Sequence, residues 1–215
     1  MFVARCGGSE LHGSCLEIGP SGVSYRSLVV SPELRQLRYE MGCFEACLYV
    51  CLRIFPERNP RWFILHPLQR RLKALPVYHA PESSSSFVTL GLGVYVIGGL
   101  VNGKPTSDVS YFDCYEHTMY SMPPMKMARA SASARLIDGK IYVFGGLGVD
   151  EAEADSSNWA EVFDVKTKTW DLSFVFTPKM PLNIQHSVVI NEEKRVFAVD
   201  KDGQDFSFSP SKSIF

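Results

Sequence analysis

The sequence predicts an all-β fold, an incomplete β-propeller of about three to four four-stranded antiparallel blades that follows a short helix. Three observations support this prediction. An apolar strand that ends in a glycine doublet occurs twice, and a shared aromatic segment follows both copies. The third is the length of 215 residues, because propellers close with about four to eight blades of about 50 residues each. We therefore expect an open arc.

The repeat is defined by two blocks that occur in the same order. The glycine-doublet strand lies at 93–99 and at 140–146, and the second block lies at 111–119 and at 162–170. The spacing between copies differs slightly for the two blocks, which indicates one repeat with loops of different length. A strand-like run precedes each doublet strand, and Asp138-Gly139 between two of these strands is typical of a hairpin turn. Each unit is therefore interpreted as four short strands, one propeller blade.

These units resemble the kelch repeat, which combines an apolar strand, a glycine doublet, an aromatic residue and a tryptophan. The residues that carry the resemblance are Gly98, Gly99, Gly145, Gly146, Phe112, Phe163 and Trp170. Glycine permits unusual backbone conformations and close approach between blades, and the tryptophan is expected to pack on the next blade. Met119 stands in the first unit where the family has tryptophan.

Weaker copies flank the two clear units. Upstream, 47–52, 61–65 and 71–75 are interpreted as the inner, third and outer strands of a degenerate blade, and 195–199 falls where a further doublet strand is expected. The predicted organisation is an irregular or disordered N-terminus (1–23), an F-box remnant (24–46), a degenerate blade (47–82), kelch repeats at 83–125 and 126–178, and a partial repeat (179–215).

The segment before the blades carries a helix signal. Ser31-Pro32-Glu33-Leu34 places a serine N-cap before proline at the first helical position, and Leu37 and Met41 continue at helical spacing. With the strands that follow, this run resembles the plant F-box/kelch-repeat family, in which an F-box binds the Skp-type adaptor of a cullin-based ubiquitin ligase. Residues 1–23 lack amphipathic periodicity, so we expect a truncated F-box and weakened adaptor docking.

The resemblance implies a protein-recognition subunit whose propeller loops bind a protein substrate for ubiquitination. Its partners would be that substrate, a Skp-type adaptor and a cullin. The longest insertions between predicted strands, 100–108 and 147–158, are the candidate binding loops, with no contact residue chosen. The alternatives are a kelch binding protein that needs no adaptor, a truncated product without stable function, and a kelch metalloenzyme.

Four groups of residues have the composition of metal sites without a convincing spacing. They are Cys114 with Tyr115 and His117, Glu151 with Asp155 and Trp159, Cys43 with Cys47 and Cys51, and Cys6 with His12 and Cys15. Alternation along a strand separates Cys114 from His117, tryptophan cannot bind iron, and the third group has no histidine pair nearby. Phosphate-binding and hydrolase motifs are also absent from the sequence. We therefore expect no metal, no cofactor and no enzymatic activity.

Composition narrows the partners and the compartment. The formal charge is −1, which gives no general attraction to nucleic acid or anionic lipid. The sequence has no run of about 18 apolar residues, so no membrane-spanning helix is expected. The N-terminus lacks a signal-peptide core and the six cysteines form no Cys-x-x-Cys pair, which favours a reducing compartment, cytoplasmic or nuclear.

Overall fold

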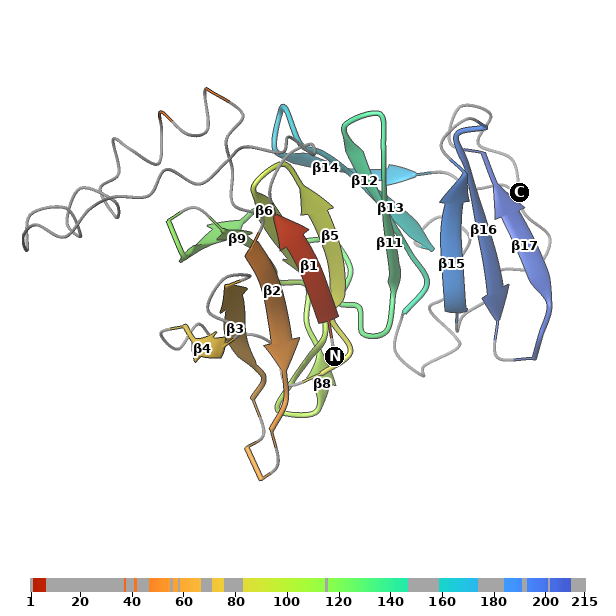
Figure 1. Ribbon diagram of the computed structural model, residues 1–215. Coiled ribbons are helices and arrows are strands. Elements are labelled where there is room, and N and C mark those ends of the chain that lie inside the picture. Colours follow the sequence, from red (N-terminus) through yellow and green to blue (C-terminus); the bar gives the residue numbers. More distant parts are fainter. Residues whose placement is uncertain are drawn as a thin grey trace, which may run out of the picture.

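The regular structure of the described residues is β almost throughout. The computed structural model describes residues 2–6, 37, 41, 47–54, 56–57, 59–66, 71–75, 83–114, 116–146, 159–173, 184–190, 193–200 and 202–209. These residues form four antiparallel sheets and one small two-stranded ribbon (Figure 1). The predicted all-β fold is confirmed.

Each sheet is assembled from strands in chain order, and we number the sheets as blades 1 to 4. Blade 1 contains β1 (Phe2–Cys6), β2 (Cys47–Leu52), β3 (Arg61–His66) and β4 (Arg71–Ala74). Blade 2 contains β5 (Ser86–Leu90), β6 (Gly93–Ile97), β9 (Val109–Asp113) and β10 (Thr118–Met122). The ribbon of β7 (Leu100–Val101) and β8 (Lys104–Pro105) lies between β6 and β9.

The last two blades repeat this order. Blade 3 contains β11 (Ser133–Ile137), β12 (Lys140–Phe144), β13 (Ala160–Asp164) and β14 (Thr169–Ser173). Blade 4 has three strands within the described residues: β15 (Ile184–Ile190), β16 (Arg195–Asp200) and β17 (Asp205–Phe208). Each blade thus pairs neighbours in sequence, as a propeller blade requires.

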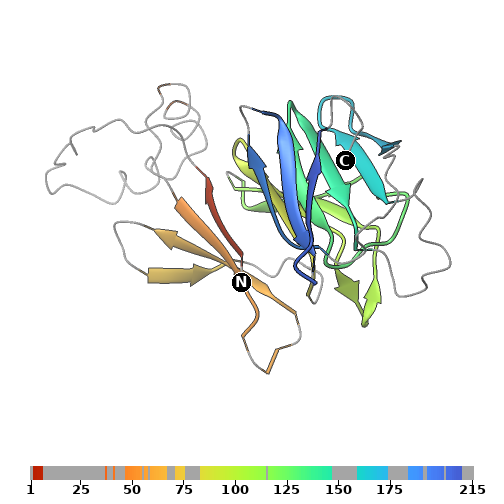
Figure 2. The same cartoon turned by 90° about the vertical axis from the view of Figure 1, so that its right-hand side faces the viewer.

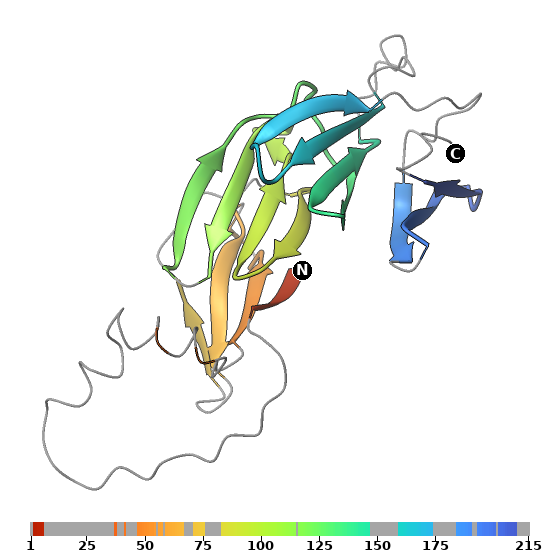
Figure 3. The same ribbon diagram turned by 90° about the horizontal axis from the view of Figure 1, so that it is seen from above.

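The four blades form an open arc. They stand beside one another in chain order, and the turned view separates blade 1 from the other three (Figures 1 and 2). The first strands of the blades, β1, β5, β11 and β15, line the concave side of the arc (Figure 3) and contact their neighbours in turn. The described residues thus form an open arc of propeller blades, the architecture that the sequence predicts.

Three apolar cores lie between the blades, one at each junction. Alternate residues of β6 point to opposite faces: Val94 and Val96 join the core shared with blade 1, whereas Tyr95 and Ile97 join the core shared with blade 3. Blade 3 divides its side chains in the same way, with Phe144 in the core shared with blade 4. Blades 2 and 3 are therefore buried on both faces, which explains why their central strands are almost continuously apolar.

Aromatic rings fill these junctions. Trp62 of β3 stacks on Phe112 of β9 with ring centroids 4.7 Å apart and planes inclined by 16°. Between blades 2 and 3, the ring centroids of Phe163 and Trp170 lie 4.9 Å apart. Between blades 3 and 4, those of Phe144 and Trp159 lie 5.5 Å apart. Large flat side chains suit this position because each buries much apolar surface between two sheets.

The N-terminus differs from the expected irregular segment. Phe2–Cys6 forms strand β1, which pairs with β2 in continuous antiparallel register from Phe2↔Cys51 to Cys6↔Cys47. Cys47–Leu52 is consequently the second strand of blade 1 and not the inner one. Phe2–Cys6 lies outside the repeated blocks of the sequence, and its pairing partner lies more than forty residues along the chain.

The predicted helix falls largely outside the described residues. Leu37 is helical, and the Met41 N–H donates a hydrogen bond of 2.9 Å to the Leu37 carbonyl, the spacing of an α-helical turn. The remainder of 24–46 and residues 7–23 lie outside the part of the chain that the structure describes.

Candidate recognition surface at the glycine-doublet end of the blades

The glycine doublets end the second strands of blades 2 and 3. All four glycines have positive φ: 56° at Gly98, 115° at Gly99, 69° at Gly145 and 67° at Gly146. Side chains with a Cβ rarely adopt these conformations. The chain can therefore turn sharply out of β6 and β12 at the same end of the two blades.

The doublets also lie against the linker that joins blade 2 to blade 3. A Cβ at Gly146 would lie 2.5 Å from the Ala132 nitrogen, and one at Gly98 would collide with the Arg129 carbonyl oxygen. Hydrogen bonds close both contacts: Gly99 N–H donates to the Arg129 carbonyl at 2.8 Å, and Ala130 N–H donates to the Gly146 carbonyl at 2.8 Å. Both glycine doublets are thus hydrogen-bonded to the linker between blades 2 and 3.

The first candidate binding loop, 100–108, contains the β7–β8 hairpin. Its turn residues Asn102 and Gly103 have φ of 51° and 72°, the positive pair that a type I′ turn needs. The base is held by Leu100 N–H, which donates to the Ser83 carbonyl at 2.8 Å, and by Thr106 N–H, which donates to the Gly99 carbonyl at 3.0 Å. Val101 is 43% exposed near the tip. The second candidate loop, 147–158, lies outside the described residues.

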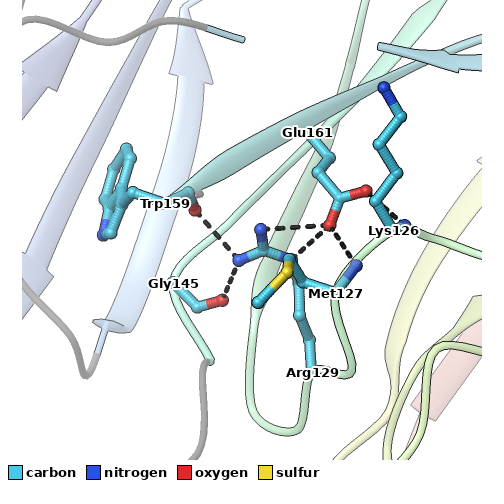
Figure 4. Close-up of polar contacts among 6 residues, drawn as sticks. All are labelled: Lys126, Met127, Arg129, Gly145, Trp159 and Glu161. Atoms are coloured by element: carbon cyan, nitrogen blue, oxygen red, sulfur yellow. Dashed lines mark hydrogen bonds and ion pairs between the residues drawn. The ribbon is translucent and has the colours of Figure 1, made fainter. Parts of the chain in front are cut away.

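A buried ion pair lies behind the hairpin. The side chains of Arg129 and Glu161 are both fully buried, and two guanidinium nitrogens lie 3.2 and 3.1 Å from Glu161 Oε1 (Figure 4). Arg129 Nη1 also donates to the carbonyls of Gly145 at 2.6 Å and Trp159 at 2.9 Å. Burial lowers the pKa of Arg129 and Glu161 opposes that shift, yet arginine remains protonated at neutral pH.

The Glu161 carboxylate is also bonded to the linker main chain. Its Oε2 accepts the Lys126 N–H at 2.6 Å, and its Oε1 accepts the Met127 N–H at 3.0 Å. Sequence reasoning missed this pair. An acidic residue inside the apolar strand Ala160-Glu161-Val162-Phe163 was the available signal, since a charge seldom occupies a buried position without a partner.

The aromatic residues of the motif lie in the blade junctions and not at the surface. Phe112 and Phe163 are fully buried, and the Trp170 indole N–H donates to the Pro123 carbonyl at 2.7 Å. Trp170 packs in the core between blades 2 and 3, so it contacts the preceding blade. Met119, which replaces tryptophan in the first unit, packs against the core between blades 1 and 2.

The described residues that were considered as metal ligands lie in separate parts of the structure. Cys114 is buried in the core between blades 1 and 2, and Trp159 packs beside Phe144. Burial raises the pKa of Cys51 to about 11. Within the described residues, no three histidine, cysteine or acidic side chains are grouped to hold a metal ion. Tyr115, Cys43, Glu151 and Asp155 lie outside the described residues.

His117 is bonded to a tyrosine of the neighbouring blade. Tyr49 Oη lies 2.6 Å from the Cys114 carbonyl oxygen and 2.8 Å from His117 Nε2. A carbonyl only accepts, so the tyrosine proton points to Cys114 and His117 Nε2 must carry the proton it donates. His117 therefore joins blade 2 to blade 1.

A known protein family matches the part of the chain that contains the repeats. The model of the FKB95 kelch-repeats domain matches residues 62–214, most of the chain. The chain belongs to the plant F-box/kelch-repeat family.

Among the described residues, no helix is long and apolar enough to cross a membrane.

Relatives in the family support the same assignment. Three F-box/kelch-repeat proteins of Arabidopsis thaliana are 43%, 40% and 37% identical to the chain over 153, 159 and 174 residues. Each alignment covers 69% of this chain, and the shares of the relatives' own lengths are 56%, 41% and 44%. The chain thus spans about half the length of the relatives it matches.

Proposed function

We propose that this kelch chain is a protein-recognition module that binds through the glycine-doublet end of its blades. The observation that carries this proposal is the β7–β8 hairpin, whose exposed tip stands on a base hydrogen-bonded to Ser83, Gly99 and Arg129. Binding loops on a rigid β scaffold are a common arrangement for recognition. We propose no enzymatic activity for this chain.

The specific role that we propose is substrate recognition in a Skp–cullin–F-box ubiquitin ligase. The relatives are named F-box/kelch-repeat proteins, and the Ser31-Pro32-Glu33-Leu34 run resembles the end of an F-box. The partners would be a protein substrate, a Skp-type adaptor and a cullin, in the cytoplasm or nucleus. Adaptor docking would depend on residues 24–46, which carry only the last part of the F-box pattern.

A second candidate is a kelch binding protein that works without an adaptor. The observation that favours it is β1, because Phe2–Cys6 is the first strand of blade 1 and pairs along β2. Residues that precede 24–46 in the sequence therefore belong to a blade. Under this candidate the blades still bind a protein, but no ligase is recruited.

A pull-down with a purified Skp-type adaptor separates the two candidates. A relative with a complete F-box serves as the positive control, and the chain with Leu34→Asp, Leu37→Asp and Met41→Asp serves as the negative control. Binding that the triple substitution abolishes supports the ligase subunit. If the relative binds and this chain does not, the ligase proposal is wrong and the adaptor-independent candidate is retained.

A further inference from the structure

The Arg129–Glu161 pair makes its contacts across chain segments, not within one sheet. Glu161 belongs to β13, yet the hydrogen bonds of its carboxylate go to Lys126, Met127 and Arg129 of the linker. Buried ion pairs seldom add much net stability, because desolvation of the charges offsets their attraction. We therefore ask whether the Arg129–Glu161 pair fixes the position of the chain segments that it joins.

Blade 2 shows that a sheet of this kind does not need the carboxylate. Ser110 pairs with Val96 of β6, and Glu161 pairs with Val143 of β12, so the two residues occupy the same register position in their blades. Blade 2 forms the same four-stranded sheet with a serine there. The charge at Glu161 is therefore not required to build the strand.

The main chain of Arg129 reaches in the other direction, to the hairpin. Its N–H donates to the Thr106 carbonyl at 3.0 Å, and its carbonyl accepts the Gly99 N–H at 2.8 Å. Four residues earlier, Met125 N–H donates to the Ser107 carbonyl at 2.9 Å. Both sides of the hairpin base are thus attached to the linker, and the linker is attached to blade 3 through the ion pair (Figure 4).

We propose that Arg129 and Glu161 are positioning residues that fix the β7–β8 hairpin and the linker segment 123–128, which precedes Arg129, as one rigid recognition surface. The exposed residues of this surface include Val101, Lys104, Pro105, Pro123, Pro124 and Lys126. Its biological meaning rests on the proposed recognition function. A preformed surface suits a folded protein partner that contacts hairpin and linker together, because little ordering cost is incurred on binding.

Amide hydrogen exchange of the unmodified chain gives the first test. The amides of Gly99 and Thr106 report on the hairpin base, and those of Lys126 and Met127 report on the bonds to Glu161. If the elements open as one unit, the four protection factors agree within about threefold. Hairpin amides that are more than about tenfold less protected than Lys126 and Met127 overturn the proposal.

A double substitution gives the second test. Replacing one member of the pair would leave an unpaired buried charge, so the variant is Arg129→Met with Glu161→Met, which removes both charges. We expect the blades to remain folded, with protection at Gly99 and Thr106 reduced at least about tenfold and protection at Ile141 and Val143 unchanged. Unchanged hairpin protection in a folded double variant contradicts the proposal.

The matched control is Ser110→Ala, at the equivalent register position of blade 2. It should leave the protection of Gly99 and Thr106 within about twofold of the unmodified chain. If the double variant does not fold, the exchange pattern of the unmodified chain decides alone. Failure to find any protein partner would refute the recognition function without altering these exchange results, so the two failures remain distinguishable.

Discussion

Gly146 combines two demands that only glycine meets. Its φ is 67°, and a Cβ would lie 2.5 Å from the Ala132 nitrogen and 2.7 Å from the Ala130 carbonyl oxygen. Backbone atoms cannot move aside as a flexible side chain can. Gly139 has a similar φ of 74° but has nothing within 4 Å of its Cβ position. Substitution at Gly139 therefore introduces backbone strain alone, whereas substitution at Gly146 introduces strain and steric collision.

We predict that Gly146→Ala lowers the free energy of unfolding by more than about 2 kcal/mol, because strain and collision add. Gly139→Ala should cost only about 1 kcal/mol, the price of a left-handed conformation alone. Urea denaturation of both variants measures the difference. Equal losses would show that the linker does not lie against Gly146.

Trp170 is fixed by one hydrogen bond to the linker. Its indole N–H reaches the Pro123 carbonyl, and phenylalanine would keep the ring contact with Phe163 but remove the donor. We predict that Trp170→Phe lowers the free energy of unfolding by about 1–3 kcal/mol, since a part-buried hydrogen bond and some apolar volume are lost. Tyr120→Phe, at a position 41% exposed, is the control and should be nearly neutral. A loss no larger than that of the control would contradict the observed packing.

At the scale of single elements, the turn between β13 and β14 depends on one carboxylate. Asp164 Oδ1 accepts the N–H groups of Lys166 at 2.9 Å and Thr167 at 3.1 Å. The bond from Thr167 is the main cause that lowers the pKa of Asp164, with the Lys166 amide and Lys140 acting in the same direction. Asp113 accepts the Glu116 N–H at 3.0 Å in the corresponding turn of blade 2.

This pKa shift has a defined sign. A carboxyl whose pKa is lower in the folded chain stabilises the fold above the unfolded pKa of about 3.9, and that stabilisation is lost as the pH falls through the folded pKa. We predict that Asp164→Ala lowers the melting temperature at pH 7, and that the difference from the unmodified chain shrinks below about pH 4. The control is Asp171→Ala, on the exposed side of β14. A difference that is constant from pH 7 to pH 3 would contradict the account.

The elements show where sequence reasoning was sufficient. The glycine doublets, the aromatic segments and Asp138-Gly139 predicted the strands of blades 2 and 3, because turn chemistry and apolar runs are local signals. Strand β1 could not be found, since Phe2–Cys6 lies outside the repeated blocks and its partner β2 is distant in sequence. The pairing of Arg129 with Glu161 was likewise non-local, and the packing of Trp170 against blade 2 was not indicated by the repeat pattern.

For the whole molecule, stability depends on the junctions between blades. Each of the three apolar cores is shared by two adjacent sheets, so no blade buries its faces alone. Such arrays behave as coupled neighbours along one dimension. Disruption of the junction between blades 2 and 3 should therefore destabilise the blades on both sides of it.

We predict that Ile141→Ala, in the fully buried core between blades 2 and 3, lowers the free energy of unfolding by about 2–5 kcal/mol. Thermal unfolding followed by near-ultraviolet circular dichroism reports on the tryptophans Trp62, Trp159 and Trp170, which lie in all three junctions. Leu72→Ala, on the exposed strand β4, is the control and should have little effect. A loss confined to signals from one half of the arc would show that the junctions are independent.

The central claim is that the glycine-doublet end of the kelch blades recognises a protein. Site-specific photo-crosslinking tests it most directly, with a photoreactive amino acid at Val101 on the hairpin and, as a matched control, at Lys166 in the exposed turn at the opposite end of blade 3. In extracts of plant cells, the account predicts one defined protein adduct from position 101 that is absent from position 166. Adducts that are identical from both positions, or no adduct from position 101, would contradict it.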